Sequence, residues 1–140
     1  MGSISKNFSY SEFEKSDIAK RYGIINIVNT YEVRDNIKAL VDNVLQPLRE
    51  AWGKPLTINS GYRCIELNKA VGGVPTSQHI VGQAADVGCS DPLALARLAK
   101  KMRLPYDQMG VYSTFVHFSY AEDRNRGQIF YSKDYKGEKV

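Results

Sequence analysis

The sequence predicts an α+β fold, in which helices pack on an antiparallel sheet within one domain. Two observations carry this prediction. Apolar residues recur at intervals of three and four in the first half of the chain, which is the spacing of a helix that buries one stripe. The last third instead has the pattern of short strands joined by turns.

Length and composition favour a single domain spanning residues 1–140, with its core at about 7–132. The chain has 140 residues, of which 43% are hydrophobic, and this is enough to bury a core of its own. It contains no internal repeat, low-complexity tract or long linker. The polar tail at 133–140 is expected to be frayed.

The chain is expected to open with a helix. Ser9-Tyr10-Ser11-Glu12 has the form of a capping box, in which the serine hydroxyl meets an early backbone N–H and the glutamate reaches back. Phe13 and Ile18 then supply apolar positions, and Gly23 supplies a stop.

A second, longer helix is predicted to begin after Asn29-Thr30 and to end at Gly53. Pro47 is expected to bend it, because the proline ring removes an N–H and clashes with the preceding turn. The apolar stripe of this helix is expected to be core and to have no chemical role. It consists of Val33, Ile37, Leu40, Val41, Val44, Leu45, Leu48 and Trp52.

Residues 56–60 alternate at period two and predict a strand that delivers Gly61-Tyr62-Arg63 at its end. An arginine at a strand end can reach a pocket, and its planar fork suits a carboxylate or a developing oxyanion. The alternative for Arg63 is an ordinary surface salt bridge.

Two further helices are predicted. Residues 66–71 form a short one, closed by Gly72-Gly73. Asp91-Pro92 begins the other, because an N-cap acceptor precedes proline at the first helical position. Its sheet-facing residues are expected to be Leu93, Leu95, Leu98 and Met102.

The last third is expected to consist of antiparallel strands. If Ser113-Thr114 is a two-residue turn, Gly110 pairs opposite His117, and alternation places Gln108 and Tyr112 on the face of that histidine. Residues 124–127 are predicted to turn into a final strand at 129–131.

The decapeptide at 77–86 has the form S-x-H-x-x-G-x-A-x-D and indicates a metal site. The chain has only two histidines, and His79 stands seven positions before the carboxylate of Asp86, with residues between them that are mostly small or apolar. His117, between two apolar neighbours, offers a third ligand. Zinc takes imidazole nitrogen and carboxylate oxygen, and a catalytic site uses three protein ligands. We therefore predict a zinc cleft, and expect Ser77 to hold the ligand loop or to contact substrate.

Four segments in one order carry a resemblance to the zinc D-Ala-D-Ala carboxypeptidase family, which includes vancomycin-resistance dipeptidases and phage endolysins. The similarity spans about 7–126. The segments are Ser60-Gly61-Tyr62-Arg63, Asn68-Lys69-Ala70-Val71-Gly72-Gly73, the decapeptide, and Phe115-Val116-His117-Phe118-Ser119-Tyr120.

The resemblance implies a Hedgehog/DD-peptidase fold and a zinc metallopeptidase that acts on peptidoglycan. It makes His79, Asp86 and His117 the Zn²⁺ ligands and Arg63 a substrate or transition-state contact. Hydrolysis would use water activated by zinc, which lowers its pKa from about 15.7 to about 7. Gln108, on the His117 face, is a candidate substrate contact, and the scissile bond lies in the peptide stem or cross-link.

The general base is the feature that this sequence lacks at the expected positions. Related sequences often place a carboxylate three residues before the last histidine ligand, where this chain has Thr114, and others place one two residues after it, where it has Ser119. Three accounts stay open. In the first, a carboxylate from elsewhere in the chain folds into the site, although the spacing of the nearest acids, Asp107, Glu122 and Asp123, does not place them there. Alternatively, Tyr112 acts as proton donor or transition-state contact, or the site binds zinc without turnover.

A site that binds zinc without turnover would make the chain a cell-wall-binding or structural module. A further alternative is that the two histidines are core residues that bind no metal. The charge of +4 and pI near 9.0 also invite a nucleic-acid function, but the basic clusters are not interleaved with aromatic residues. We expect no nucleic-acid or membrane partner and a monomer that binds peptidoglycan peptides.

The N-terminal residues lack the pattern of a secretory signal, so the chain is expected to be made in the cytoplasm and to reach the cell wall after release or lysis. This favours a phage or prophage endolysin. Reduced thiols at Cys64 and Cys89 are favoured over a disulfide, and neither cysteine has metal-site spacing.

Overall fold

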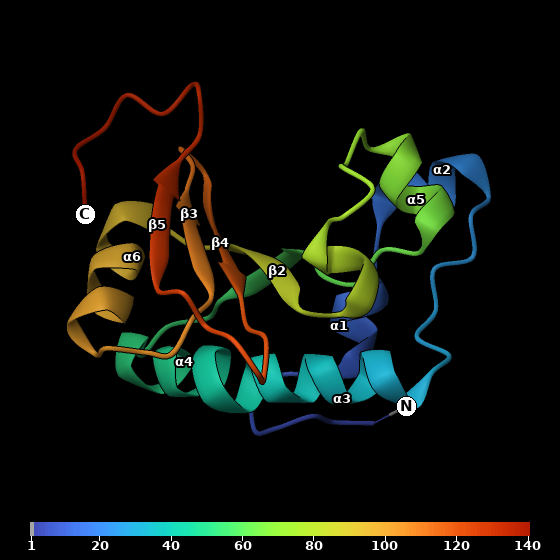
Figure 1. Ribbon diagram of the computed structural model, residues 1–140, viewed down its shortest axis with the longest axis horizontal. Coiled ribbons are helices and arrows are strands. Elements are labelled where there is room, and N and C mark those ends of the chain that lie inside the picture. Colours follow the sequence, from blue (N-terminus) through green and yellow to red (C-terminus); the bar gives the residue numbers. More distant parts are fainter. Residues whose placement is uncertain (1) are drawn as a thin grey trace.

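Five strands form one sheet in the computed structural model, which describes residues 2–140 (Figure 1). The order across the sheet is β1-β2-β4-β3-β5, and all neighbours pair antiparallel except β3 and β5. The strands are β1 (Thr57–Ser60), β2 (Ala84–Gly88), β3 (Gln108–Val111), β4 (Phe115–Ser119) and β5 (Gln128–Tyr131). The predicted α+β class is confirmed.

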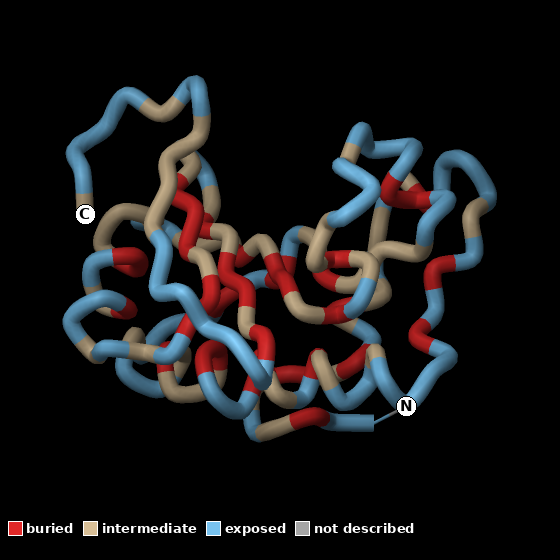
Figure 2. Tube along the Cα trace, in the orientation of Figure 1, coloured by how far each residue is buried: buried red, intermediate tan, exposed pale blue. Residues whose placement is uncertain are grey.

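The main core lies between this sheet and a long helical rod. The rod consists of α3 (Tyr31–Leu40), the π-helical turn η1 (Val41–Leu45) and α4 (Gln46–Trp52), and it runs along one face of the sheet (Figure 1). Figure 2 shows buried positions of the rod and of the strands facing one another. They include Ile37, Leu40, Val44, Leu48, Val87, Met109, Val116 and Phe118. The predicted apolar stripe is therefore core.

The π turn lies immediately before Pro47. The N–H of Gln46 bonds the carbonyl of Val41, one residue farther back than in an α-helix. Because proline has no N–H to donate, the carbonyl four residues before it loses its usual partner. The expected irregularity at Pro47 thus takes the form of a π turn inside a continuous rod, and Gly53 ends the rod in the left-handed conformation.

The predicted first helix is instead two short helices, α1 (Tyr10–Glu14) and α2 (Asp17–Tyr22). Lys15 between them is extended, with ψ of 132°, and the side chain of Ser16 accepts a hydrogen bond from the N–H of Ala19. An internal serine that caps a new helix competes with continuation of the old one. Gly23 ends α2 in the left-handed conformation, as expected.

The other two predicted helices are present. They are α5 (Ile65–Ala70) and α6 (Pro92–Lys101), and Asp91 caps α6 by accepting from the N–H of Ala94. Leu95 is fully buried, Leu98 and Met102 are partly buried against the core, and Leu93 is half-buried. Among residues 2–140, no helix is long and apolar enough to span a membrane.

The last strand corrects one expectation, because β5 pairs parallel with β3. Residues 120–127 connect the end of β4 to the start of β5. Since β4 and β3 are antiparallel, the end of β4 lies beside the start of β3. A short connection from that point reaches the far side of β3 only at its start, and β5 must then run in the same direction as β3.

A buried carboxylate holds this connection. Asp107 is fully buried and accepts three hydrogen bonds from Arg126: from its backbone N–H at 3.0 Å, Nε at 2.8 Å and Nη2 at 2.9 Å. Gln128 N–H bonds the carbonyl of Asp107 at 3.0 Å. These bonds join the start of β3 to the start of β5.

The C-terminal tail differs from the frayed segment that we expected. Arg97 of α6 pairs with Glu138 at 3.0 Å, and the N–H of Val140 bonds the hydroxyl of Tyr131 at 2.8 Å. The ammonium of Lys139 lies 3.9 Å from the centre of the Tyr131 ring. The tail therefore lies against β5 and α6.

The contribution of the Asp107–Arg126 ion pair to stability can be tested by replacing Asp107 and measuring stability against pH. Hydrogen bonds from Arg126 hold the pKa of Asp107 at about 2, below its ordinary 3.8. A lowered folded-state pKa contributes stability that is complete above the ordinary pKa and is lost as pH falls through the folded one. We expect Asp107→Asn to lower the urea midpoint at pH 7, and the difference from wild type to shrink between about pH 4 and pH 2.

Asp134→Asn, which changes an exposed carboxylate, is the matched control. A difference between wild type and Asp107→Asn that stays constant over this pH range would contradict the role of the ionised pair.

Candidate metal centre

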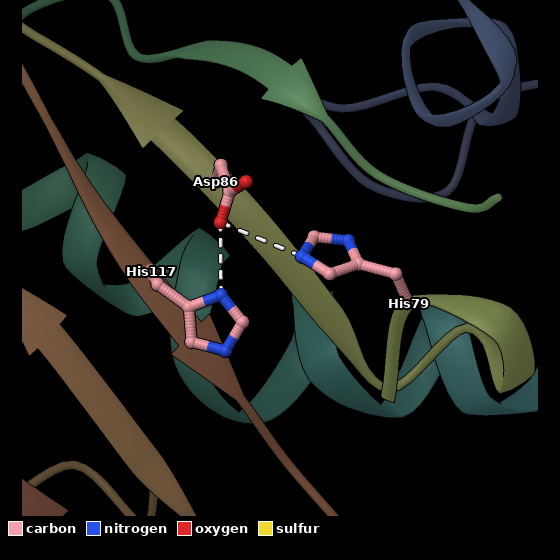
Figure 3. Close-up of side chains that lie close together, drawn as sticks. All are labelled: His79, Asp86 and His117. Atoms are coloured by element: carbon pink, nitrogen blue, oxygen red, sulfur yellow. Dashed lines mark hydrogen bonds and ion pairs between the residues drawn. The ribbon is translucent and has the colours of Figure 1, made fainter. Parts of the chain in front are cut away.

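Three side chains from three elements converge on the outer face of the sheet (Figure 3). His79 lies on the 3-10 turn η2 (Gln78–Val81), Asp86 on β2 and His117 on β4. One ligand atom from each lies within 4.8 Å of the other two. Asp86 Oδ1 is 2.8 Å from His117 Nδ1 and 3.5 Å from His79 Nε2. The three predicted ligands are thus brought together.

Strand pairing places two of the three. Asp86 and His117 are direct partners in the antiparallel register of β2 and β4, so their side chains leave the same face of the sheet. The flanking residues of β4, Val116 and Phe118, point to the opposite face and are fully buried in the core. Core burial therefore fixes the face on which the ligands lie.

His79 is held by its backbone and by its ring. The hydroxyl of Ser77 accepts from the N–H of His79 at 3.2 Å, and the ring Nδ1 lies 2.7 Å from the carbonyl oxygen of Gly61. Donation from Nδ1 to that carbonyl leaves the lone pair of Nε2 facing Asp86, as metal binding requires. This bond gives Ser77 the loop-holding role, one of the two roles considered for it.

Gly82 makes the tight turn between His79 and Asp86. It has φ of +78°, and a Cβ there would lie 2.7 Å from the carbonyl oxygen of Val33. A side chain would therefore be both conformationally strained and crowded against α3. This agrees with the interpretation that small residues in the decapeptide allow the chain to return to the metal.

Asn26 holds the backbone that follows Gly61 and was not predicted as a site residue. Its side-chain amide donates to the carbonyls of Glu14 and Tyr62, both at 2.9 Å, and its oxygen accepts from the N–H of Cys64 at 2.8 Å. It is 7% exposed. A single asparagine in a loop carries no sequence signal of such a role.

Arg63 lies beside the predicted metal ligands rather than on the open surface. Its Nε donates to Ser60 at 3.1 Å, its Nη1 to Asn68 at 3.1 Å, and its Nη2 is 3.6 Å from Asp86 Oδ2. Its side chain is 15% exposed. A Cβ at Gly73 would lie 2.1 Å from the Asn68 oxygen, so the glycine at this position leaves room for the contact between Asn68 and Arg63. The salt bridge that forms is part of the site.

The charge state of Asp86 suits a metal ligand. Burial alone opposes ionisation, but the imidazole of His117, hydrogen-bonded to Oδ1, and the nearby imidazole of His79 hold the pKa of Asp86 well below its usual range. Two imidazole nitrogens and one ionised carboxylate oxygen are a donor set that zinc accepts. The chemistry of the three residues therefore fits this metal.

Tyr112 lies on the His117 side of the sheet, as the alternation predicts. Gly110 pairs with His117, which confirms the predicted register of the hairpin. The Tyr112 ring stacks on Phe115 with centroids 4.3 Å apart, and Phe130 lies 6.0 Å from the His117 ring. These aromatic rings form one wall beside the metal ligands.

The hydroxyl of Tyr112 is electrostatically coupled to the centre. Burial raises the pKa of Tyr112, the negative charge of Asp86 raises it further, and the positive charge of Arg63 lowers it. The net effect is upward, so the phenol is protonated at neutral pH and can donate a hydrogen bond.

A pocket with a volume of about 380 Å³ is lined in part by His117. It contains both candidate substrate contacts, Ser77 and Gln108. Gln78, Arg124 and Arg126 also line it, and none of them was singled out from the sequence.

The three nearby acids do not supply a second carboxylate to the cluster. Asp107 bonds Arg126 and Gln78, Glu122 lies beside the outer face of α3, and Asp123 is exposed in a turn. Within residues 2–140, Asp86 is the only carboxylate in the metal-ligand cluster. Of the three accounts of the missing base, the one that needs a carboxylate from elsewhere finds no support in the positions of these acids.

Comparison with known proteins agrees with this geometry. The family model of Peptidase M15 matches residues 6–119, a range that contains all three ligand candidates and Arg63. A zinc D-Ala-D-Ala carboxypeptidase of Streptomyces albus G is 35% identical over 98 residues, which is 67% of this chain and 36% of that protein. The chain thus matches only about a third of the length of this curated relative. By the match over 6–119, it belongs to the peptidase M15 family.

Proposed function

We propose that this chain is a zinc-dependent peptidase that hydrolyses an amide bond in the peptide part of peptidoglycan. The observation that carries the proposal is the cluster of His79, Asp86 and His117, whose ligand atoms lie within 4.8 Å of one another. The M15 family and the name of the Streptomyces relative support zinc and a D-alanyl peptide as metal and substrate.

His79, Asp86 and His117 hold the metal in this proposal. When bound, zinc supplies a Lewis acid and a nucleophilic water at neutral pH. The chain contributes the fixed tautomer of His79, through the Gly61 carbonyl, and an ionised Asp86. It also closes one side of the centre with aromatic rings, which limits solvent access there.

Arg63 binds the oxygen on which negative charge develops, or the carboxylate of the peptide. Ser60 and Asn68 fix its guanidinium, so the side chain loses little freedom when substrate arrives. Its Nη2, 3.6 Å from Asp86, stands at the metal ligands rather than in solvent. A planar donor so placed is suited to an oxyanion.

Tyr112 donates a proton or a hydrogen bond to the reacting group. The metal-ligand cluster of residues 2–140 has no second carboxylate, and the protonated phenol is a polar group coupled to Asp86 and Arg63. The absence of that carboxylate also favours the second candidate function, a zinc-binding wall module with little or no turnover.

The proposal includes an endolysin-type role at the cell wall, as a carboxypeptidase or an endopeptidase. The net charge of +4 supports it, because an anionic wall attracts a basic protein.

Zinc-dependent cleavage is the first test. We expect zinc-loaded protein to release new amino groups from purified peptidoglycan, and chelator-treated protein and His79→Ala, with lower zinc content, to release far fewer. Mass spectrometry of the products names the bond. No release by zinc-loaded protein, on walls of several peptide types, would favour the binding module.

Arg63→Ala is expected to lower kcat/KM by about 10²–10³-fold while zinc content stays at the wild-type level, because one oxyanion donor contributes about that much. Arg63→Lys keeps the charge without the planar fork and should recover only part of the loss. Arg21→Ala, at an exposed position of α2, is the control. Loss of zinc or of folded structure in Arg63→Ala would instead make Arg63 a structural residue.

Tyr112→Phe keeps the ring that stacks on Phe115 and removes only the hydroxyl. We expect kcat to fall by about 10²-fold or more with little change in KM, because acid–base catalysis contributes about 10²–10⁴-fold. Tyr22→Phe, at an exposed position, serves as control. A wild-type kcat in Tyr112→Phe would exclude this role.

A further inference from the structure

The pocket beside His117 carries positive charge that the metal site does not use. Arg124 and Arg126 both line it, and none of its lining residues is acidic. Its volume of about 380 Å³ suits a small polar group of a ligand rather than a whole peptide. Both arginines lie beyond residues 6–119, the range matched to the family.

The guanidinium of Arg126 is held by Asp107 but, within the part of the chain that the structure describes, keeps a free hydrogen-bond donor group, Nη1. Asp107 engages its Nε and Nη2, at 2.8 Å and 2.9 Å, so one edge of the guanidinium is occupied. The Nη1 group has no bond among those of residues 2–140, and the side chain is 42% exposed. Because Asp107 holds the fork rigid, a ligand that bonds the free edge orders no long side chain.

Arg124 supplies the unbalanced charge. Asp107 neutralises Arg126, but within the described chain the guanidinium of Arg124 has neither an ion-pair nor a hydrogen-bond partner. Its backbone N–H bonds the carbonyl of Ala121 at 3.1 Å, and Asn125 accepts from the N–H of Ala121 at 2.9 Å. The loop that presents Arg124 is therefore held in place.

The same pocket wall is tied to the metal centre. Gln78, adjacent to His79 in η2, donates to Asp107 Oδ2 at 3.1 Å. Asp107 thus joins the turn that carries a metal ligand to the arginine that lines the pocket. A group held by the arginines lies at a defined position relative to the bond that is cut.

We propose that this pocket is a carboxylate-binding subsite, in which Arg124 and Arg126 hold an acidic group of the wall peptide. This inference rests on the proposed function for its substrate class. An anion is favoured because the lining has two cations and no acid, and a carboxylate is the anion that a wall peptide offers. Arginine binds carboxylates through paired N–H donors, which Arg126 Nη1 and Arg124 supply.

Wall peptides carry this chemistry in two places. One is the free C-terminal carboxylate, whose recognition makes the protein a carboxypeptidase. The other is the α-carboxylate of a γ-linked D-glutamate within the stem, whose recognition permits cleavage inside a cross-link. The experiment separates them by amidating one carboxylate at a time.

The probes are the tetrapeptide L-Ala-γ-D-Glu-L-Lys-D-Ala and its two single amides, at the D-glutamate α-carboxylate and at the C-terminus. Calorimetric titration gives their dissociation constants for zinc-loaded wild type and Arg124→Gln, with mass spectrometry confirming that the peptides stay intact. In wild type we expect one amide to bind roughly tenfold more weakly, the size of a charge-assisted bond. In Arg124→Gln, the same amidation should raise the dissociation constant by less than about twofold. The reason is that the amidation and the substitution both remove the same interaction between the arginine and the carboxylate.

Arg21→Gln, on the exposed surface of α2, is the matched control and should behave as wild type. Equal losses on amidation in wild type and Arg124→Gln, or no loss for either amide in wild type, would overturn the subsite. Because this measurement of binding needs no turnover, it is independent of the test for hydrolysis. If amidation weakens binding only when Arg124 is present, but the wall is not hydrolysed, the subsite stands and the peptidase proposal fails. If the wall is hydrolysed but the effect of amidation does not depend on Arg124, the peptidase proposal stands and the subsite fails.

Discussion

A carboxylate between two imidazoles is the interaction on which the site depends. Asp86 lies on an inner strand, where burial opposes its charge, but the two neighbouring imidazoles hold the pKa of Asp86 well below its usual range. Its register partner on β4 is His117, so any slip of the β2–β4 pairing by one residue would turn one of them into the core. The sheet therefore encodes the donor geometry, and the apolar residues on its other face keep the register.

Around this centre the chain supplies supports from distant segments. Asn26, in the loop before α3, clasps the backbone whose Gly61 carbonyl orients His79. Arg63, from the end of β1, reaches Asp86 while Asn68 of α5 holds it. Contacts of this kind fix the tautomer and the orientation of side chains that bind a metal. Gly73 lies where Asn68 contacts Arg63, and a side chain at this position would collide with Asn68.

Two dissimilar groups of side chains lie near His117, and β5 and the residues just before it contribute to both. Phe130, within β5, adds to the aromatic wall beside His117. Arg126, just before β5, belongs to the cationic pocket. The parallel entry of β5, fixed by the bonds between Asp107 and Arg126, thus brings both an aromatic and a cationic side chain close to His117.

The sequence by itself determined the elements whose signals are local: the caps at Ser9 and Asp91, the apolar stripe, the hairpin register and the candidate ligands of the decapeptide. Only the tertiary structure decided the direction of β5, because period-two alternation is the same for parallel and antiparallel strands. The break at Ser16 depended on a competition between caps that periodicity does not register. Asp107 and Arg126 are 19 residues apart, and their pairing, like the positions of Asn26 and Arg124, followed from where loops end rather than from any motif.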